Sequence, residues 1–208
     1  MSGEAYGLGA SIILATTAVV SLLGLYAAPG LIGLAAFRPY TLFRNAQYWR
    51  LVSSGFVHAN LSHLLFNLLT FYFFAFRLER RIGTVAFVAL YGLGLLLGNL
   101  STYVRHRNEP DYVTVGASGA VSAVLFASIV YFPTMRLYIF PLPVPIPALI
   151  FAVLYLGYSY YQSRQSGDRV NHDAHIGGAL TGLGFVAVAD PSAYGQLVAV
   201  IQALSSSG

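Results

Sequence analysis

Long apolar segments alternate with short polar ones along the whole chain. A helix that crosses a lipid bilayer needs about 20 mostly apolar residues, and several segments reach or approach that length. They cover residues 9–29, 56–76, 84–104, 115–133, 147–162 and 173–189. The pattern therefore predicts an all-α membrane protein in which residues 1–208 form one domain with six transmembrane helices. Residues 190–208 form a tail whose apolar part is too short to cross the membrane.

Two connections between these expected spans have unusual composition. The loop after the first span is rich in arginine and aromatic residues. Before the fifth span, prolines stand at alternate positions of residues 141–147. Proline lacks a backbone N–H and disfavours the helical conformation of the residue before it, so we expect this connection not to be helical throughout.

The composition excludes a soluble enzyme. Only 9% of the residues are Asp, Glu, Lys or Arg, whereas a soluble domain carries roughly 25%, and the mean hydropathy is +0.68. So few charges cannot cover a hydrophobic core of this size with a polar surface. We expect a multi-pass integral membrane protein in contact with the lipid bilayer.

Cysteine and charge exclude further classes. The chain has no cysteine, which rules out disulfides, zinc–thiolate sites and cysteine nucleophiles. Its basic residues are all arginines, scattered among the loops without forming a basic stripe. Nucleic acid is therefore not an expected partner.

The first candidate for chemistry is Ser118, in the segment Gly116-Ala117-Ser118-Gly119 at the start of the fourth span. In the first turn of a helix, its hydroxyl would lie beside free backbone N–H groups and the positive end of the helix dipole, which favour an anion. The flanking glycines allow another backbone to approach. Taken alone, however, the segment is more typical of close helix packing in membranes.

The second candidate is His175, which shares one face of the sixth span with Gly178 and Gly182. These glycines form a small-residue pair along which a neighbouring helix can pack, so His175 is expected to face that neighbour. A serine hydroxyl becomes a nucleophile when an adjacent base accepts its proton. Asp173 lies about 200° around the helix from His175. We therefore predict a Ser118–His175 dyad without a carboxylate.

A third polar group, His58, His63 and Asn67, lies on the second span. His63 and Asn67 are four residues apart on one helix face, and both offer N–H donors suited to an oxyanion hole. His58 lies on another face and is expected to make structural hydrogen bonds. Two histidines could also contribute to a zinc site, but no inward carboxylate accompanies them, so no metal is expected.

Taken together, these motifs resemble one known family. They are, in order, Trp49-Arg50; His58 with His63 and Asn67; Glu79 with Gly83; Gly116-x-Ser118-Gly119; and Ala174-His175 with Gly178 and Gly182. This ordered set, from Trp49 to about Gly182, is similar to the rhomboid family of intramembrane serine proteases. The resemblance implies a compact rhomboid-like bundle of six helices, no cofactor, and transmembrane proteins as substrates.

The resemblance also implies individual roles. Ser118 would be the nucleophile and His175 the general base, while His63, Asn67 and the backbone N–H of Ser118 would stabilise the oxyanion. Structural support is expected from Trp49, Arg50, His58, Glu79, Gly83, Gly116, Gly119, Gly178 and Gly182.

One position departs from the family pattern. Family members often carry an aromatic or large residue one turn after the nucleophile, where it packs on the catalytic imidazole. The residue here is Ser122, so another aromatic side chain would have to hold the ring.

Membrane orientation receives two conflicting signals. Loops on the side of the termini carry four arginines and the opposite loops carry seven, which taken alone places the termini outside the cell. The resemblance implies the reverse, with cytoplasmic termini in an inner or plasma membrane and a site that opens on the extracytoplasmic side. We follow the resemblance, because three of the seven arginines lie in the first loop, which is folded structure in the family.

The expected reaction is hydrolysis of a peptide bond in or near a transmembrane segment of a membrane protein. The alternative is an inactive relative that binds membrane clients without cutting them; the joint presence of Ser118, His175, His63 and Asn67 favours the protease. A transporter is disfavoured, because the sequence lacks inverted repeats and charged residues that would face a pathway.

Overall fold

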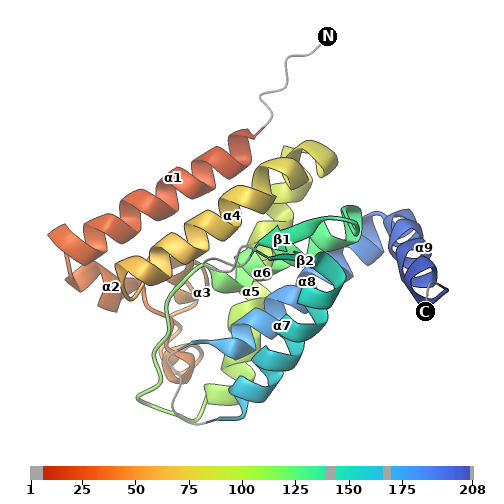
Figure 1. The fold of residues 1–208 in the computed structure, drawn as a ribbon. Helices are drawn as coiled ribbons and strands as arrows, with labels where there is room; N and C mark the ends of the chain where they lie inside the picture. The colour runs from red at the N-terminus through yellow and green to blue at the C-terminus, as the bar shows by residue number, and fades with distance from the viewer. Residues whose placement is uncertain (1–6, 139–143, 166–169, 207–208) are drawn as a thin grey trace.

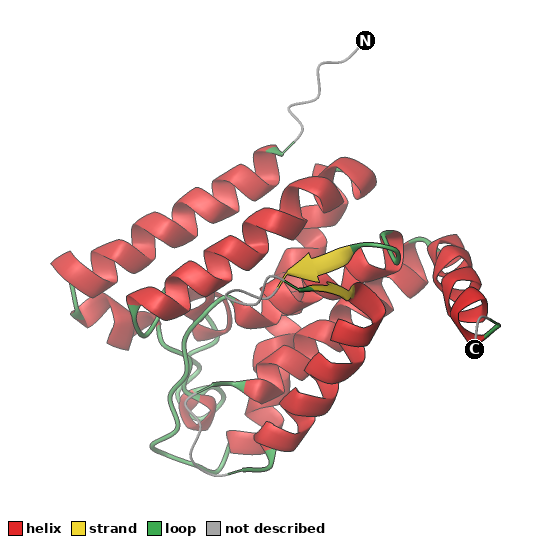
Figure 2. Cartoon of the chain, in the orientation of Figure 1, coloured by secondary structure: helices red, strands yellow, loops and turns green. Residues whose placement is uncertain are grey.

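The structure, a computed structural model, describes residues 7–138, 144–165 and 170–206, and its architecture is almost entirely helical (Figures 1 and 2). The helices are α1 (Leu8–Leu22), which continues as a π-helical turn (Leu23–Ala27), α2 (Gly30–Ala35), α3 (Arg50–Ser53), α4 (Leu61–Ile82), α5 (Thr84–His106), α6 (Ser118–Tyr131), α7 (Ala148–Ser163), α8 (His172–Ala189) and α9 (Tyr194–Ser205). Short 3₁₀ turns occur at Pro39–Thr41, Ser54–Phe56 and Pro191–Ala193.

Helix α6 is the centre of the bundle. It packs against α4, α5 and α8, and every residue from Gly119 to Tyr131 is buried. A helix that is apolar on all sides is expected in such a position. The other helices surround it: α1 lies beside α4, and α7 covers α8 (Figure 1).

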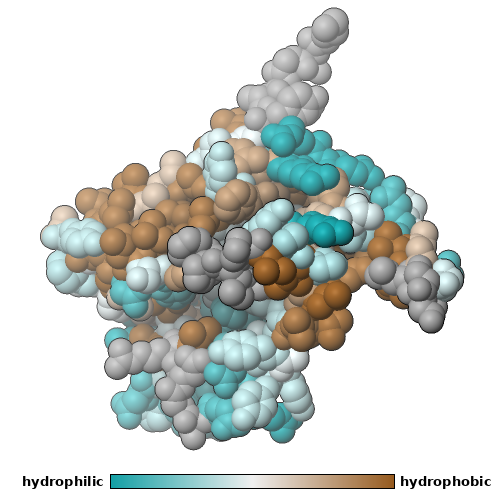
Figure 3. Space-filling model, in the orientation of Figure 1, coloured by the Kyte–Doolittle hydropathy of each residue, from teal (hydrophilic) through white to brown (hydrophobic). Residues whose placement is uncertain are grey.

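The lengths of the helices agree with a membrane protein. Within the described residues, three helices are long and apolar enough to cross a bilayer: Leu8–Ala27, Leu61–Ile82 and Thr84–His106. Figure 3 shows hydrophobic residues over α1 and α4, and hydrophilic ones near the loops at the lower end. Helices α6, α7 and α8 overlap the remaining predicted spans. The division of residues 1–208 into one six-span domain stays a prediction.

The predicted bounds of the second span, 56–76, are wrong by about a turn and a half. Helix α4 begins at Leu61 because the Asn60 side chain caps it, accepting a hydrogen bond from the backbone N–H of His63 at 2.8 Å. It continues through the charged residues 77–81 and stops at Gly83, whose φ of +83° is favourable only for glycine. The charged cluster lies in the helix rather than after it.

The segments around α7 and α9 have structure of their own. Strand β1 (Arg136–Tyr138) pairs antiparallel with β2 (Pro145–Pro147), with Leu137 opposite Ile146. Pro145 and Pro147 are therefore extended, as expected, whereas Pro141 and Pro143 lie outside the described residues. The tail contains α9, which turns by 110° from α8 and extends away from the bundle (Figure 1).

Candidate active site

Ser118 is the first residue of α6 and is half-buried. The backbone N–H groups of a helix's first turn have no acceptor within the helix, so α6 offers free N–H groups at the end where Ser118 stands. Just before it, Gly116 has a φ of +121°, a conformation that other residues rarely adopt. This glycine turns the chain sharply into α6.

The segment that leads to Ser118 is fixed by the first loop. Phe37 and Thr114 exchange two backbone hydrogen bonds of 2.9 and 3.0 Å. The N–H of Gly116 donates to the carbonyl of Ser54 at 2.9 Å. The first loop is therefore part of the framework of the site rather than a free connection.

His58 is fully buried beneath this segment. Its Nε2 accepts from the N–H of Ala117 at 3.4 Å, and its Nδ1 lies 2.8 Å from the Ser21 hydroxyl. That hydroxyl donates to the carbonyl of Phe56 at 2.9 Å, so the ring must carry its proton on Nδ1. These contacts make His58 a structural link from α1 to the residue before Ser118.

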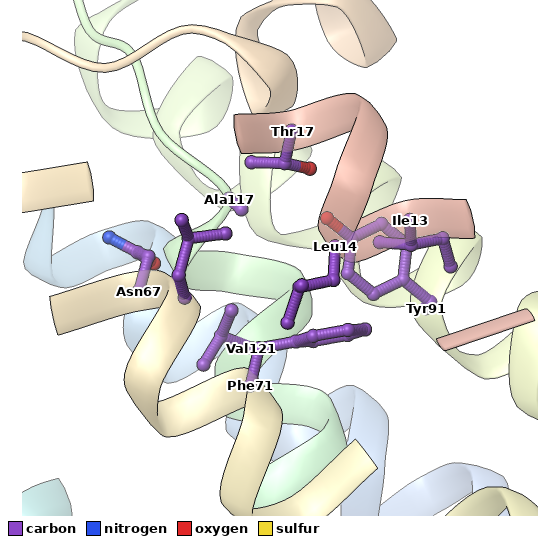
Figure 4. A pocket seen from close by; sticks show the side chains of 9 residues that line it. Ile13, Leu14, Thr17, Asn67, Phe71, Tyr91, Ala117 and Val121 are labelled. Atoms are coloured by element: carbon purple, nitrogen blue, oxygen red, sulfur yellow. The ribbon is translucent and has the colours of Figure 1, made fainter. Parts of the chain in front are cut away.

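His63 and Asn67 border the same turn from α4. A side-chain carbon at Gly116 would lie 2.6 Å from Cε1 of His63, so the imidazole rests directly against this glycine. Asn67 is buried and donates to the carbonyl of His63 at 2.9 Å. Figure 4 shows Asn67 on the wall of a small cavity of about 10 Å³, which Ala117 and Val121 also line.

The contact between α6 and α8 is made by backbone atoms. A side-chain carbon at Gly178 would overlap the carbonyl of Gly119, and one at Gly182 would overlap the carbonyl of Ala123. Such close approach requires glycine on α8. Gly178 and Gly182, which the sequence predicts as a packing face, do form one, and this face contacts α6, the helix that begins with Ser118.

His175 lies in the first turn of α8, one turn before Gly178. Its ring is stacked on Tyr155 of α7, with centroids 5.8 Å apart and planes 19° apart, and it meets the edge of His172 at 5.5 Å. The helix contact thus brings together the two elements that carry Ser118 and His175. Tyr155 was not found by sequence reasoning, because nothing local relates it to His175.

Asp173 takes part in a separate cluster at the same end of the bundle. Its carboxylate lies 3.1 Å from Nε2 of His106 and 3.6 Å from Nε of Arg105. Tyr112 stacks on His106 at 3.7 Å. Burial, reinforced by the charges of Asp173 and Glu109, raises the pKa of Tyr112 to about 12.

Asn171 is a second residue that sequence reasoning missed. Its side-chain oxygen accepts from the N–H of Ala174 at 3.0 Å and so caps α8. Its amide donates to Thr102 of α5 at 2.9 Å and to Thr114 at 3.2 Å. An asparagine directly before an apolar helix was the available signal. It fixes the helix end that carries His175.

The other predicted support residues lie away from this turn. The carboxylate of Glu79, near the far end of α4, accepts from the N–H groups of Gly9 and Ala10 at 2.9 and 2.8 Å. Gly83 joins α4 to α5.

Arg50 and Trp49 belong to the first loop. Arg50 is buried and donates to the carbonyls of Gly33 and Ala36 at 3.1 and 2.6 Å. Trp49 is exposed, and the guanidinium of Arg50 lies 5.9 Å from its ring centroid.

No metal-ligand cluster is found among the described residues: no three His, Asp or Glu side chains come close enough to hold an ion. The chemistry available at the turn is that of a serine hydroxyl, imidazoles and N–H donors.

The sequence matches the Rhomboid domain over residues 45–190. The chain belongs to the rhomboid family. Residues 45–190 include Ser118, His175, His63 and Asn67. The protein is thus a multi-pass integral membrane protein with the helical bundle of a rhomboid domain.

Individual relatives agree with this assignment. YdcA of Bacillus subtilis is 45% identical over 78 residues, covering 37% of this chain and 38% of YdcA. RHOMBOID-like protein 5 of Arabidopsis thaliana is 31% identical over 159 residues, or 75% of this chain and 49% of that protein. Rhomboid protease GlpG of Haemophilus influenzae is 28% identical over 148 residues, or 69% of this chain and 71% of GlpG. The matches to YdcA and RHOMBOID-like protein 5 thus span less than half of those relatives.

Proposed function

We propose that this rhomboid protein is an intramembrane serine endopeptidase that cuts transmembrane proteins through a Ser118–His175 dyad. One observation carries the proposal. The backbone contact of Gly119 with Gly178 joins the first turn of α6, where Ser118 stands, to α8 one turn after His175. The protease names of relatives such as GlpG support the same reaction.

In the first half of the reaction, Ser118 attacks the carbonyl carbon of the scissile peptide bond while His175 accepts the hydroxyl proton. The oxyanion receives hydrogen bonds from His63, Asn67 and the backbone N–H of Ser118. When the C–N bond breaks, the protonated His175 gives its proton to the leaving amine. An ester of Ser118 remains.

In the second half, water attacks this ester and His175 accepts a proton from it. The second oxyanion uses the same donors. Its collapse breaks the ester bond, and the proton returns from His175 to the Ser118 oxygen. The products are a carboxylic acid and free enzyme, and no metal or other cofactor takes part.

The substrate follows from the physics of the bilayer. A transmembrane helix satisfies its backbone polar groups internally, so a peptide bond is accessible to Ser118 only where that helix unwinds. Segments with glycine or proline are the expected targets. The site opens on the extracytoplasmic side of an inner or plasma membrane, with both termini in the cytoplasm.

A serine-reactive fluorophosphonate probe tests the proposal. Purified protein in liposomes would be compared with Ser118→Ala, His175→Ala and the control Ser128→Ala, whose hydroxyl bonds within α6 to the carbonyl of Val124 at 2.8 Å. Labelling of wild type and Ser128→Ala alone, together with cleavage of a transmembrane reporter, is expected. A folded wild type that neither labels nor cleaves overturns the protease and favours an inactive binder of membrane clients.

A further inference from the structure

We infer that Tyr155 of α7 is a positioning residue that fixes the imidazole of His175 for catalysis. The inference rests on the proposed function. It starts from the stacked pair itself: the two rings lie 19° from parallel with centroids 5.8 Å apart. The ring stacked on the candidate general base therefore comes from neither of the helices that carry the dyad.

Tyr155 is itself held in place from several directions. Its hydroxyl and the Ser122 hydroxyl are 2.8 Å apart. Its ring also meets Phe151 of α7 at 5.6 Å and Phe126 of α6 at 5.7 Å. A ring bound at its tip and packed at its sides presents a fixed face to His175.

The surroundings of His175 explain why such a face matters. Where α8 meets α6, the residues are small: Gly119 and Ala123 on α6 and Gly178 on α8. Small residues allow the close helix contact, but they offer an imidazole little surface. Ser122 stands one turn after Ser118 and donates or accepts a single hydrogen bond, and that bond goes to Tyr155. Ser122 and Tyr155 thus act together as the support of the ring.

This arrangement makes the orientation of the base depend on α7. Helix α7 packs on α8 with one face, and its other face, which includes Val153 and Leu154, is exposed. Removal of the Tyr155 ring should leave the α6–α8 backbone contact in place and change only how often His175 faces Ser118. The expected effect is on the rate of serine activation, not on substrate binding.

The test compares ring-free and ring-bearing variants. Tyr155→Leu and the longer Tyr155→Met remove the ring, whereas Tyr155→Phe keeps it without the hydroxyl. Tyr161→Leu is a matched control, because Tyr161 is exposed on the same helix. Stacked aromatic pairs predict a loss of roughly two- to tenfold in the rate of fluorophosphonate labelling for Leu and Met. We expect Phe to retain most of the rate and Tyr161→Leu to match wild type. For reporter cleavage, kcat falls in the ring-free variants and KM is unchanged.

A measurement that does not depend on catalysis tests the positioning role of Tyr155 separately from the proposed protease activity. In protein labelled with ¹⁵N-histidine, loss of the Tyr155 ring should shift the His175 ring resonances and alter their pH titration, whereas Tyr161→Leu should not. Ring-free variants that label at the wild-type rate with unchanged His175 resonances overturn the positioning role. A wild type that never labels overturns the protease, and the resonances then decide alone whether Tyr155 orients His175.

Discussion

The backbone N–H of Ala117 donates to the imidazole of His58, across 59 residues of sequence, at 3.4 Å. The other ring nitrogen meets Ser21 of α1 at 2.8 Å. Helix α1 is therefore connected, through one neutral histidine, to the residue that precedes the candidate nucleophile. The Ser21–His58 contact on α1 is therefore expected to influence the position of Ser118.

Replacement of Ser21 should weaken this connection. Ser21→Ala leaves the buried Nδ1–H of His58 and the carbonyl of Phe56 without that partner, which should cost about 1–3 kcal/mol of unfolding free energy. Denaturation in detergent micelles measures the loss. Ser11→Ala, an exposed position on the same helix, should stay within about 0.5 kcal/mol of wild type. Equal effects of both variants would contradict the link.

A methyl group at Gly178 should separate α6 from α8. Its carbon would overlap the Gly119 carbonyl, and overpacking of this kind costs about 1–3 kcal/mol or more. The measurement is the unfolding midpoint together with the labelling rate of Ser118, both of which should fall. Gly184→Ala is the control, because a carbon there meets nothing within 4 Å. If Gly178→Ala were as stable and reactive as the control, the contact would not be essential.

The carboxylate of Glu79 should stabilise the start of α1. It accepts hydrogen bonds from two backbone N–H groups and, at 2.7 Å, from the Thr84 hydroxyl. The Glu79 residue is only 1% exposed. Glu79→Gln removes the charge that these donors and the α1 dipole favour, a loss of about 1.5–3 kcal/mol. Hydrogen exchange should show earlier opening of α1. Glu109→Gln, on an exposed side chain, should leave α1 protection as in wild type; identical exchange in Glu79→Gln would be the contrary result.

Loss of the Asn67 amide should lower the rate of catalysis more than it lowers stability. The amide bonds within its own helix, to the carbonyl of His63, and an oxyanion donor contributes about 10²–10³ in kcat. Reporter cleavage by Asn67→Ala should fall by that order with little change in the unfolding midpoint. Cleavage within a few-fold of wild type would remove Asn67 from the oxyanion site.

Tyr112 should make the free energy of unfolding fall at alkaline pH. Its folded pKa, raised to about 12, exceeds the value of about 10 in an unfolded chain. The folded state therefore holds this proton more tightly, so the stabilisation is complete below pH 10 and is lost as the pH rises toward 12. The difference in unfolding free energy between wild type and Tyr112→Phe should be constant up to about pH 10 and then fall. A flat difference up to pH 12 would argue against the burial of this phenol.

Local sequence signals predicted α1, the helices α4 to α8 and the position of Ser118 at the start of α6, but not the short helices α2 and α3 or α9 in the tail. They failed at α4, where apolar content suggested a start at residue 56, although the Asn60 cap sets it at Leu61. The charged end of α4 was also misplaced, because the burial of Glu79 against α1 is a contact between distant segments.

The support of His175 could not be read from the sequence at all. Ser122 marked a missing ring, but the chain offers many tyrosines and phenylalanines. Only the packing of α7 on α8 selects Tyr155 among them. Hydrophobic periodicity describes one helix at a time, whereas the contacts of Tyr155 join three helices, α6, α7 and α8.

The contact of α6 with α8 through peptide groups has a consequence for how such a protein can change over time. The spacing of the two helices depends on Gly178, Gly182 and the backbone they touch, not on the outward side chains. Residues such as Val188, which is 87% exposed, can thus be exchanged to suit a thicker or thinner bilayer. Substitutions on the outward surface can therefore suit a new host membrane without changing the spacing of the helices that carry Ser118 and His175.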